Sequence, residues 1–352
     1  MTWNAARDDL TERERQVLEA VIVSYVETAE PAGSRTIAKR YNHGVSAATV
    51  RNTMSDLEDR GYLYHPHTSA GRMPTDRAYR VYVDKLMAHS NVTAQEQDRL
   101  LRELGADATG IEGLLQKAAQ VLGILTQELG VAVAPSFDNA VLEQLQLMNV
   151  SSDRILMVLV LRGGAARTIF VEADSAFPRE ALDKLAGVLN ERLAGLTLRA
   201  VRRTLKERLR DATFGAGAEL LNVFVEEADN IFHLPEMEDS PVLLSSAQML
   251  AEQPEFNSNT QMRTLLEITE QRDLLRQALR ERNEPGITVT IGGENLDPKL
   301  SAFTIVTSTY HSGSLSGVIG VMGPTRMPYR KVVSLVEHTS RLMSHLAPLS
   351  AS

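Results

Sequence analysis

The sequence predicts a multidomain α+β protein. Its 352 residues are more than one hydrophobic core usually supports, so two or three domains are expected. Helical periodicity dominates the first quarter of the chain, whereas strand-like apolar runs appear from residue 131 onward and are separated by a long helical stretch. Hydrophobic residues make up 43% of the chain and charged residues 23%, which suits globular cores.

Helix start and stop signals near the N-terminus predict a first helix. Thr11 followed by Glu14 has the spacing of a capping box, in which the two side chains satisfy free backbone groups of the first turn. Apolar residues then recur at helical spacing to about Thr28. Pro31 and Gly33 break the pattern, so we expect the helix to end before them.

Two further helices follow. Ser34 is a candidate cap for a short helix that ends near Arg40, and Ser46 is the expected N-cap of a third helix. Gly61 stands where a C-terminal cap belongs. The apolar residues between these two signals recur at i, i+4 and i+7 and predict the buried side of the third helix: Val50, Met54 and Leu57.

The periodicity changes after the third helix. Residues 62–65 have the pattern of a short strand, residues 66–71 that of a loop, and residues 72–75 that of the returning strand. Three helices followed by a hairpin form the element order of a winged helix-turn-helix, a DNA-binding fold. We expect this fold to occupy residues 1–90.

The outer side of the third helix carries small and polar side chains. In a major groove, Asn can pair with adenine, Arg with guanine, and Ala or Thr can contact a thymine methyl group. The alternative is an ordinary solvated helix face. With the neighbouring helix and the hairpin loop included, the expected DNA-binding residues are Ser34, Arg35, Ser46, Ala48, Thr49, Arg51, Asn52, Ser55, His67, Thr68, Ser69 and Arg72.

The same region is basic in an acidic chain. The whole chain has a net charge of −8, yet residues 33–80 contain eight basic and four acidic side chains. Such a basic island predicts one anion-facing surface on a body that otherwise repels polyanions, although chance clustering is the alternative. Arg72 and the hydroxyl groups of the hairpin loop are candidates for phosphate contacts or for entry into a minor groove.

Catalytic and cofactor chemistry has little support. The absence of cysteine excludes disulfides, thiolate zinc sites and cysteine nucleophiles. His65 and His67 are a weak metal signal, because no third ligand lies nearby in the sequence. There is no glycine-rich phosphate loop, no Gly-x-Ser-x-Gly and no His-Glu-x-x-His. We therefore expect no enzyme, no catalytic residue, no cofactor and no bound metal.

The sequence also carries signals about location. The longest purely apolar run, residues 155–161, is too short to span a bilayer, and the first residues lack the pattern of a signal peptide. The lack of cysteine agrees with a reducing compartment. These features predict a cytoplasmic protein with no membrane partner.

The rest of the chain predicts a sheet domain with a helical interruption. Residues 91–110 are expected to form a helical connector. Residues 195–283 have helical patterns and no catalytic cluster that a lid would cover, so we interpret them as an assembly surface. Amphipathic spacing predicts a final helix over residues 329–345. The expected strands, taken as one domain, are residues 131–134, 142–150, 155–161, 167–172, 287–291, 302–310 and 315–321.

Four segments of the sequence stand out: residues 10–18, residues 46–52 (Ser-Ala-Ala-Thr-Val-Arg-Asn), residues 67–75 (His-Thr-Ser-Ala-Gly-Arg-Met-Pro-Thr) and residues 317–329, which contain Gly-Val-Met-Gly-Pro-Thr-Arg-Met-Pro-Tyr. Together they resemble the bacterial heat-inducible transcription repressor family, HrcA. The resemblance implies a winged helix, a GAF-like domain over residues 111–194 and 284–352, and an inserted dimerisation domain over residues 195–283.

The resemblance also implies a function. Proteins of this family repress chaperone operons by binding an inverted-repeat operator in double-stranded DNA as homodimers, and the GroE chaperonin keeps them active. Neither the sequence nor the resemblance supplies a ligand-binding motif in the GAF-like domain. Two other functional classes stay open: a regulator that senses a small molecule through that domain, and an uncharacterised enzyme.

Overall fold

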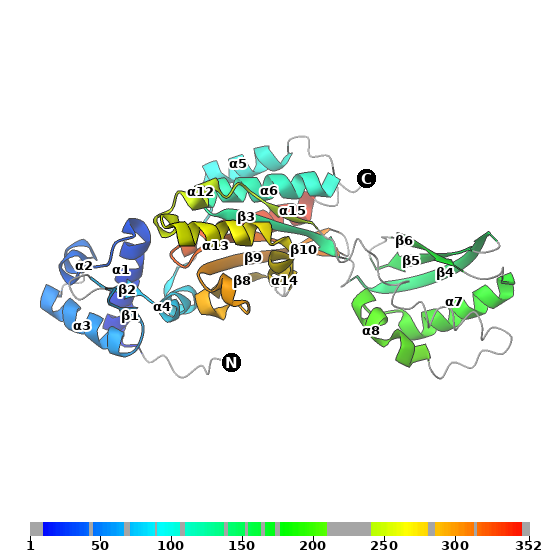
Figure 1. Cartoon of the computed structure of the whole chain (residues 1–352), viewed down its shortest axis with the longest axis horizontal. Helices are drawn as coiled ribbons and strands as arrows, with labels where there is room; N and C mark the ends of the chain where they lie inside the picture. Colours follow the sequence, from blue (N-terminus) through cyan, green and yellow to red (C-terminus); the bar gives the residue numbers. More distant parts are fainter. Residues whose placement is uncertain are drawn as a thin grey trace.

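The computed structural model describes most of the chain in three parts (Figure 1). An N-terminal helical unit is followed by a central unit around a five-stranded sheet, and a second, three-stranded sheet forms a unit of its own. The residues described are 10–41, 45–66, 71–88, 90–105, 110–136, 140–151, 154–162, 166–172, 177–209, 241–280, 286–312 and 315–346.

The N-terminal unit confirms the predicted element order. Thr11 and Glu14 form the capping box of α1, and Ser46 caps α3 by accepting from the backbone N–H of Thr49. Ser34 is the first residue of α2 and not its cap, because Gly33 provides the carbonyl group that accepts from Ile37. The elements are α1 (Glu12–Thr28), α2 (Ser34–Tyr41), α3 (Ala47–Asp59), β1 (Leu63–Tyr64) and β2 (Met73–Pro74).

Two short helical segments lead out of the N-terminal unit. Thr75 caps α4 (Asp76–Val81), which continues as a π-helical turn over Tyr82–Leu86. The connector expected over residues 91–110 contains α5 (Ala94–Gly105), which buries Leu100 and packs on α6. It is therefore part of the central unit and not a free linker.

The central unit has three layers. Its sheet has the strand order β7-β3-β10-β9-β8, and every neighbouring pair is antiparallel. Helices α6 (Gly110–Thr126) and α15 (Tyr329–Leu346) cover one face of the sheet. The strands are β3 (Leu129–Ser136), β7 (Val242–Leu244), β8 (Ile287–Ile291), β9 (Phe303–Ser312) and β10 (Leu315–Pro324).

The opposite face of the central sheet is covered by helices that the sequence analysis places in an insertion. Helices α13 (Asn259–Glu270) and α14 (Arg272–Arg280) bury leucines and isoleucines against β3 and β9. The short α12 (Gln248–Ala251) and the 3₁₀ turn Pro254–Phe256 precede them. Part of the expected insertion thus completes the central core, because the strands at its centre are buried on both faces and need a cover on each.

The second sheet contains strands that the sequence analysis assigns to the same sheet as β3. Strands β4 (Leu142–Ser151), β5 (Arg154–Leu161) and β6 (Ala166–Glu172) pair only with one another among the described residues. Helices α7 (Arg179–Leu193), which the sequence analysis does not predict, and α8 (Leu198–Leu209) close a separate apolar core over one face. Short strands with similar composition do not reveal which sheet they join, because pairing is a non-local property.

Some expectations lie outside the described residues. They are the tip of the hairpin loop at 67–70, the turns that Asn-His-Gly at residues 42–44 and Gly-Gly at residues 163–164 predict, and the helix that the apolar spacing over residues 217–230 predicts. None of the described helices combines the length and the hydropathy that a bilayer span requires.

Candidate nucleic-acid interface

Helix α3 presents two distinct sides. Val50, Met54 and Leu57 are at most 1% exposed and pack in the core of the N-terminal unit. Two polar residues on the other side, Arg51 and Asn52, are exposed and have no side-chain hydrogen bond or ion pair to any described residue. Ala48 and Ser55 are also exposed on this side, as is Asp59 at the C-terminal end of the helix.

The N-terminal end of α3 is fixed by its own side chains. The Ser46 hydroxyl accepts from the backbone N–H of Thr49 at 3.1 Å and lies 3.0 Å from the Thr49 hydroxyl. Ser46 and Thr49 therefore have local partners, while the exposed residues that follow them do not. We call the surface of Ala48, Arg51, Asn52 and Ser55 the reading face. It is a rigid helical surface with hydrogen-bonding groups free for another molecule.

Arg72, at the start of the returning strand, holds the hairpin against the rest of the N-terminal unit. Arg72 and Ala32 exchange two backbone hydrogen bonds, and an added methyl group at Gly71 would collide with the Ala32 carbonyl group. The Arg72 guanidinium donates to Glu58, near the end of α3, at 3.0 Å. The ring of His65 contacts the other oxygen of that carboxylate.

This cluster explains the electrostatics at the base of the hairpin. Partial burial alone would raise the pKa of Glu58, but the hydrogen bonds from His65 and Arg72 outweigh it and lower that pKa. Glu58 is therefore ionised at neutral pH, and Arg72, 12% exposed, is neutralised within the protein. Glu58 engages Nε and one terminal nitrogen of Arg72, so only the other N–H groups of the guanidinium are left for a phosphate contact.

Several basic side chains of the basic island are neutralised or covered by partners within the protein, so fewer of them are available on the surface than the sequence suggests. Arg40, Arg60 and Arg80 pair with Glu27, Glu14 and Glu294. Arg77 lies 4.4 Å from the ring centroid of Tyr62 and donates to its hydroxyl group. These acidic and aromatic partners come from other elements, which charge counting along the sequence cannot see. Within the basic island, the exposed basic residues with no ion-pair partner among the described residues are Arg35, Lys39 and Arg51.

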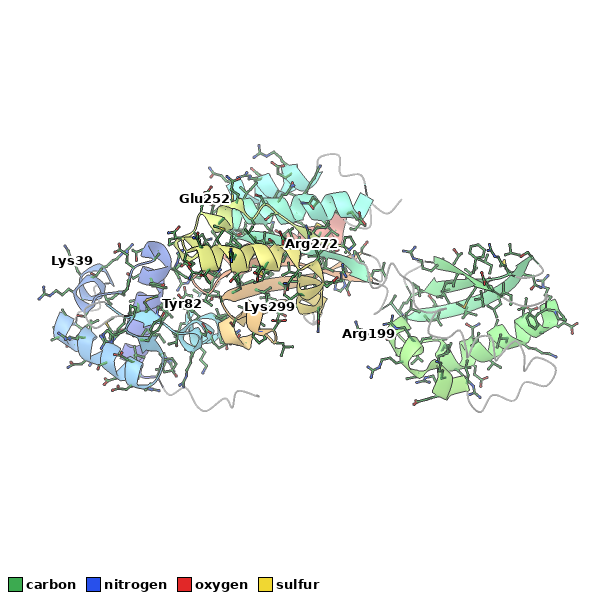
Figure 2. The ribbon with its side chains drawn as sticks, viewed as in Figure 1. Lys39, Tyr82, Arg199, Glu252, Arg272 and Lys299 are labelled. Atoms are coloured by element: carbon green, nitrogen blue, oxygen red, sulfur yellow. The ribbon has the colours of Figure 1, made fainter. Side chains whose placement is uncertain are left out.

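Lys39 is an addition to the residues predicted from the sequence. It is exposed on α2 and points away from the molecule (Figure 2). Arg35 lies one turn before it on the same helix and is also exposed, whereas Ser34 is partly buried. A signal was present in the sequence, since Lys39 belongs to the basic island and is spaced i, i+4 from Arg35.

Two further predictions from the sequence concern the hairpin loop and a metal site. His67, Thr68 and Ser69 lie outside the described residues, so the structure does not locate them. His65 hydrogen-bonds to Glu58, and the described residues contain no group of three or more His, Asp or Glu side chains suited to a metal ion.

Comparisons with known proteins place the chain in one family. The family model of the HrcA protein C-terminal domain matches residues 112–333. The heat-inducible transcription repressor HrcA of Chlorobium phaeobacteroides (strain BS1) is 41% identical, with 96% of this chain and 98% of that protein covered. The repressor of the same name from Chlorobaculum tepidum is 38% identical, with coverage of 96% and 97%.

One solved structure supports the fold. A hypothetical protein whose crystal structure was determined at 2.2 Å resolution is similar with a TM-score of 0.55 and 22% sequence identity, over 97% of this chain and 100% of that chain. The family match covers most of the chain, and full-length relatives are about 40% identical. The chain belongs to the HrcA family of heat-inducible transcription repressors and is not an enzyme.

Proposed function

We propose that the chain represses chaperone operons of the heat-shock response by binding an inverted-repeat operator as a homodimer, and that a GroE chaperonin keeps it active. In this proposal residues 1–90 are a winged helix-turn-helix, residues 91–110 are a helical connector that packs on the central unit, and the protein acts in the cytoplasm, where the DNA is. The observation that carries it is the reading face: an exposed, capped helix surface with free polar groups, in a chain that belongs to a repressor family.

The proposal gives the reading face a specific role. Asn52 would pair with adenine, Arg51 with guanine, and Ala48 would contact a thymine methyl group in the major groove. Ser46, Thr49 and Ser55 extend the same surface. Ser34, Arg35 and the hairpin residues His67, Thr68 and Ser69 would contact the phosphate backbone, which positions a protein without reading sequence. Arg72 would hold the hairpin in place through its pairing with Glu58.

A homodimer is supported by the outer face of the second sheet. Met148, Leu156 and Phe170 form a row across β4, β5 and β6, and Met148 and Phe170 are 44% and 60% exposed. Helices α7 and α8 pack on the opposite face. Exposed apolar side chains that are grouped in this way favour an interaction surface. A second copy that presents the same row would bury it with the two-fold symmetry that an inverted repeat requires.

The GAF-like assignment concerns the central unit. Its antiparallel sheet with helices on both faces is the part of the chain that we propose to be GAF-like, with the inserted dimerisation domain formed around the second sheet. The proposed chaperonin partner follows from the resemblance to the family. Chaperonin dependence suits a protein whose active state is easily lost on heating.

A ligand-sensing regulator is the second candidate. A hollow of about 500 Å³ lies beside α14 and β8 and is lined by hydroxyl, amide, carboxylate and leucine side chains. One of its lining residues, Glu294, pairs with Arg80 of the N-terminal unit. A small molecule bound there would be next to a contact with the DNA-binding part of the chain.

A mobility-shift titration tests the proposed function. The full chain is titrated against DNA from upstream of its own operon, in excess competitor DNA and at stated salt. We expect a shifted complex with the upstream DNA that unrelated DNA of equal length does not give. Equal affinity for both DNAs would contradict it. A complex that weakens only when a metabolite extract is added would favour the ligand-sensing candidate.

A further inference from the structure

Arg326 connects the central unit to the first helix of the N-terminal unit. It lies between β10 and α15, and its guanidinium donates to the carbonyl oxygen of Val26, near the end of α1, at 2.8 Å. The carboxylate of Glu255 holds the same guanidinium from the central unit, and the Arg326 side chain is 14% exposed. Because α1 has no basic residue in its own last turn, Arg326 supplies the positive charge that a helix C-terminus favours.

Arg330 forms a second contact with α1. It lies in the first turn of α15 and pairs with Glu19. Its guanidinium carbon is 5.7 Å from the ring centroid of Tyr82, which Figure 2 shows at the boundary between the N-terminal and central units. The two arginines thus hold α1 at two points along its length.

Arg80 forms the third contact, from the N-terminal side. This α4 residue donates to the Glu294 carboxylate at 2.8 Å and to the backbone carbonyl group of Val289, in β8, at 2.6 Å. Next to it, the backbone N–H of Gly293 donates to the Asp76 carboxylate at 3.0 Å. The central unit therefore holds both α1 and α4.

Buried rings fill the space between these ionic contacts. Tyr79 and Tyr82 pack on Tyr329, with ring centroids 5.5 and 6.4 Å apart. All three side chains are buried, and one continuous apolar core runs from the N-terminal unit to α6 and α15. Domains joined only by a linker move relative to one another, whereas a large apolar interface fixes their orientation.

The contacts leave the reading face free. They involve α1 and α4, whereas α3 lies on the outer side of the N-terminal unit, away from the central sheet (Figure 1). Arg51 and Asn52 remain exposed. An autoinhibitory contact would cover these residues, so the arrangement favours a role in presenting them.

We propose that Arg80, Arg326 and Arg330, the arginine clamp, are positioning residues that fix the separation and angle of the two reading faces in the dimer. The clamp then determines which spacing between operator half-sites the dimer accepts. This inference rests on the proposed function. Once one copy has bound its half-site, the second binds with an effective concentration set by geometry, and that concentration falls when the N-terminal units reorient freely.

Charge-changing variants of the full chain test the clamp. The clamp variant combines Arg80→Gln with Arg330→Glu, and the rescue compares Arg330→Glu alone with Arg330→Glu plus Glu19→Arg. Arg341→Glu is the matched control, because Arg341 lies on the same helix and pairs only with Glu337 of that helix among the described residues. Each protein is titrated against the footprinted operator, its isolated half-site, and operators with the spacer lengthened by about 5 and about 10 base pairs.

The expected result is a loss of binding affinity that appears on the two-half-site operator and not on the isolated half-site. The clamp variant should bind the operator about 10-fold more weakly, bind the half-site like the parent, and discriminate less between spacers. The Glu19→Arg exchange should restore operator affinity to the Arg330→Glu variant, and Arg341→Glu should have no effect. Circular dichroism on every variant reports whether it is folded.

Other results would overturn the inference. Parent-like affinity and spacer preference in the clamp variant would show that the clamp does not position α3. Tighter operator binding would show an autoinhibitory contact, and an equal loss on the half-site would show damage within the N-terminal unit. Failure of the parent itself to bind the operator would instead refute the proposed function.

Discussion

At the scale of single residues, the exposed polar groups of α3 take no part in the folded core and are free for the proposed DNA contacts. Arg51 and Asn52 have no partners among the described residues, so their loss removes nothing from the protein's own packing. Arg72 is different, because it is nearly buried and paired with Glu58. The sequence identifies both kinds of residue as candidates, but only the structure shows which have partners.

Alanine at Asn52 or Arg51 should weaken operator binding and leave stability unchanged. Each change should cost about 1–3 kcal/mol of specific binding, because a bidentate contact to a base edge is lost. Mobility-shift titrations on the operator and on random DNA measure the effect. Arg179→Ala, an exposed arginine of α7, controls for the loss of a positive charge. If both α3 variants bind the operator like the parent, α3 does not read the DNA through this face.

Replacing Arg72 by alanine should destabilise the folded protein and should not remove a phosphate contact. It should lower the free energy of unfolding by about 1–3 kcal/mol, because Glu58 loses a charged hydrogen bond, and it should weaken DNA binding without altering the salt dependence. Glu58→Gln should have a similar effect on stability. A decrease of about one unit in the salt slope for Arg72→Ala would show that Arg72 contacts a phosphate after all.

At the scale of elements, local signals in the sequence predict most helices and strands. The capping residues Thr11 and Ser46 and the left-handed Gly61 lie where helix rules require them. The assignment of strands to sheets is not local. Residues 142–172 and 129–136 have similar apolar patterns, yet they belong to different sheets because their partners lie far away in the sequence.

The candidate site likewise has one part that local sequence signals predict and one part that depends on non-local contacts. The reading face follows from helical periodicity and could be predicted from residues 46–57 alone. The arginine clamp could not, because its contacts join residues more than 200 positions apart. The block of residues 320–329 was recognisable as a family feature, but only the packing of Arg326 and Tyr329 shows that it contacts the N-terminal unit.

Replacing Phe170 by glutamate should dissociate the proposed dimer. The change puts a charge into the exposed apolar row of the second sheet without touching its buried core, which faces α7 and α8. Light scattering should give the dimer mass for the parent and the monomer mass for the variant at micromolar concentration. Thr168→Glu, two residues earlier on the same strand, is a control for added charge and should weaken the dimer less. A fully dimeric Phe170 variant would exclude this face as the dimer contact.

Glutamine at Glu128 should stabilise the protein at neutral pH. Burial at the start of β3 raises the pKa of Glu128 well above its ordinary value of 4.5. The folded chain therefore holds a proton that the unfolded chain releases, so this carboxyl group makes stability fall as the pH rises above 4.5. Glu128→Gln should raise the free energy of unfolding at pH 7, and the gain should shrink towards pH 4.5.

Denaturant unfolding at several pH values measures this gain. The exposed Glu103→Gln on α5 is the control and should change stability little at any pH. A Glu128→Gln protein that is less stable than the parent at pH 7 would show that the carboxylate is ionised and paired in the folded chain.

At the scale of the whole molecule, the chain has features of a protein that opens on heating. Aromatic residues make up only 5% of the chain, glycines number 22, and there are no disulfides because there is no cysteine. Three buried hydroxyl groups have no hydrogen-bond partner among the described residues: those of Tyr79, Thr307 and Thr339. Buried polar groups without partners lower the cost of local opening.

Heating should therefore inactivate operator binding, and a chaperonin with its nucleotide should restore it. Transiently exposed apolar surface makes such a chain aggregate and also makes it a chaperonin substrate. Operator binding and light scattering are followed together while the purified protein is warmed, cooled and then given chaperonin and nucleotide. Chaperonin without nucleotide is the control. Undiminished binding at heat-shock temperatures, or no recovery with functional chaperonin, would contradict this mechanism.

Footprinting on the DNA upstream of the chain's own operon tests the central claim most directly. The reading faces of a dimer should protect two symmetry-related segments, separated by about one or two helical turns, and the Asn52→Ala protein should lose that protection at the same concentration. Protection of one continuous, asymmetric segment, or the same protection by the Asn52→Ala protein, would contradict the account in which two copies of α3 read an inverted repeat.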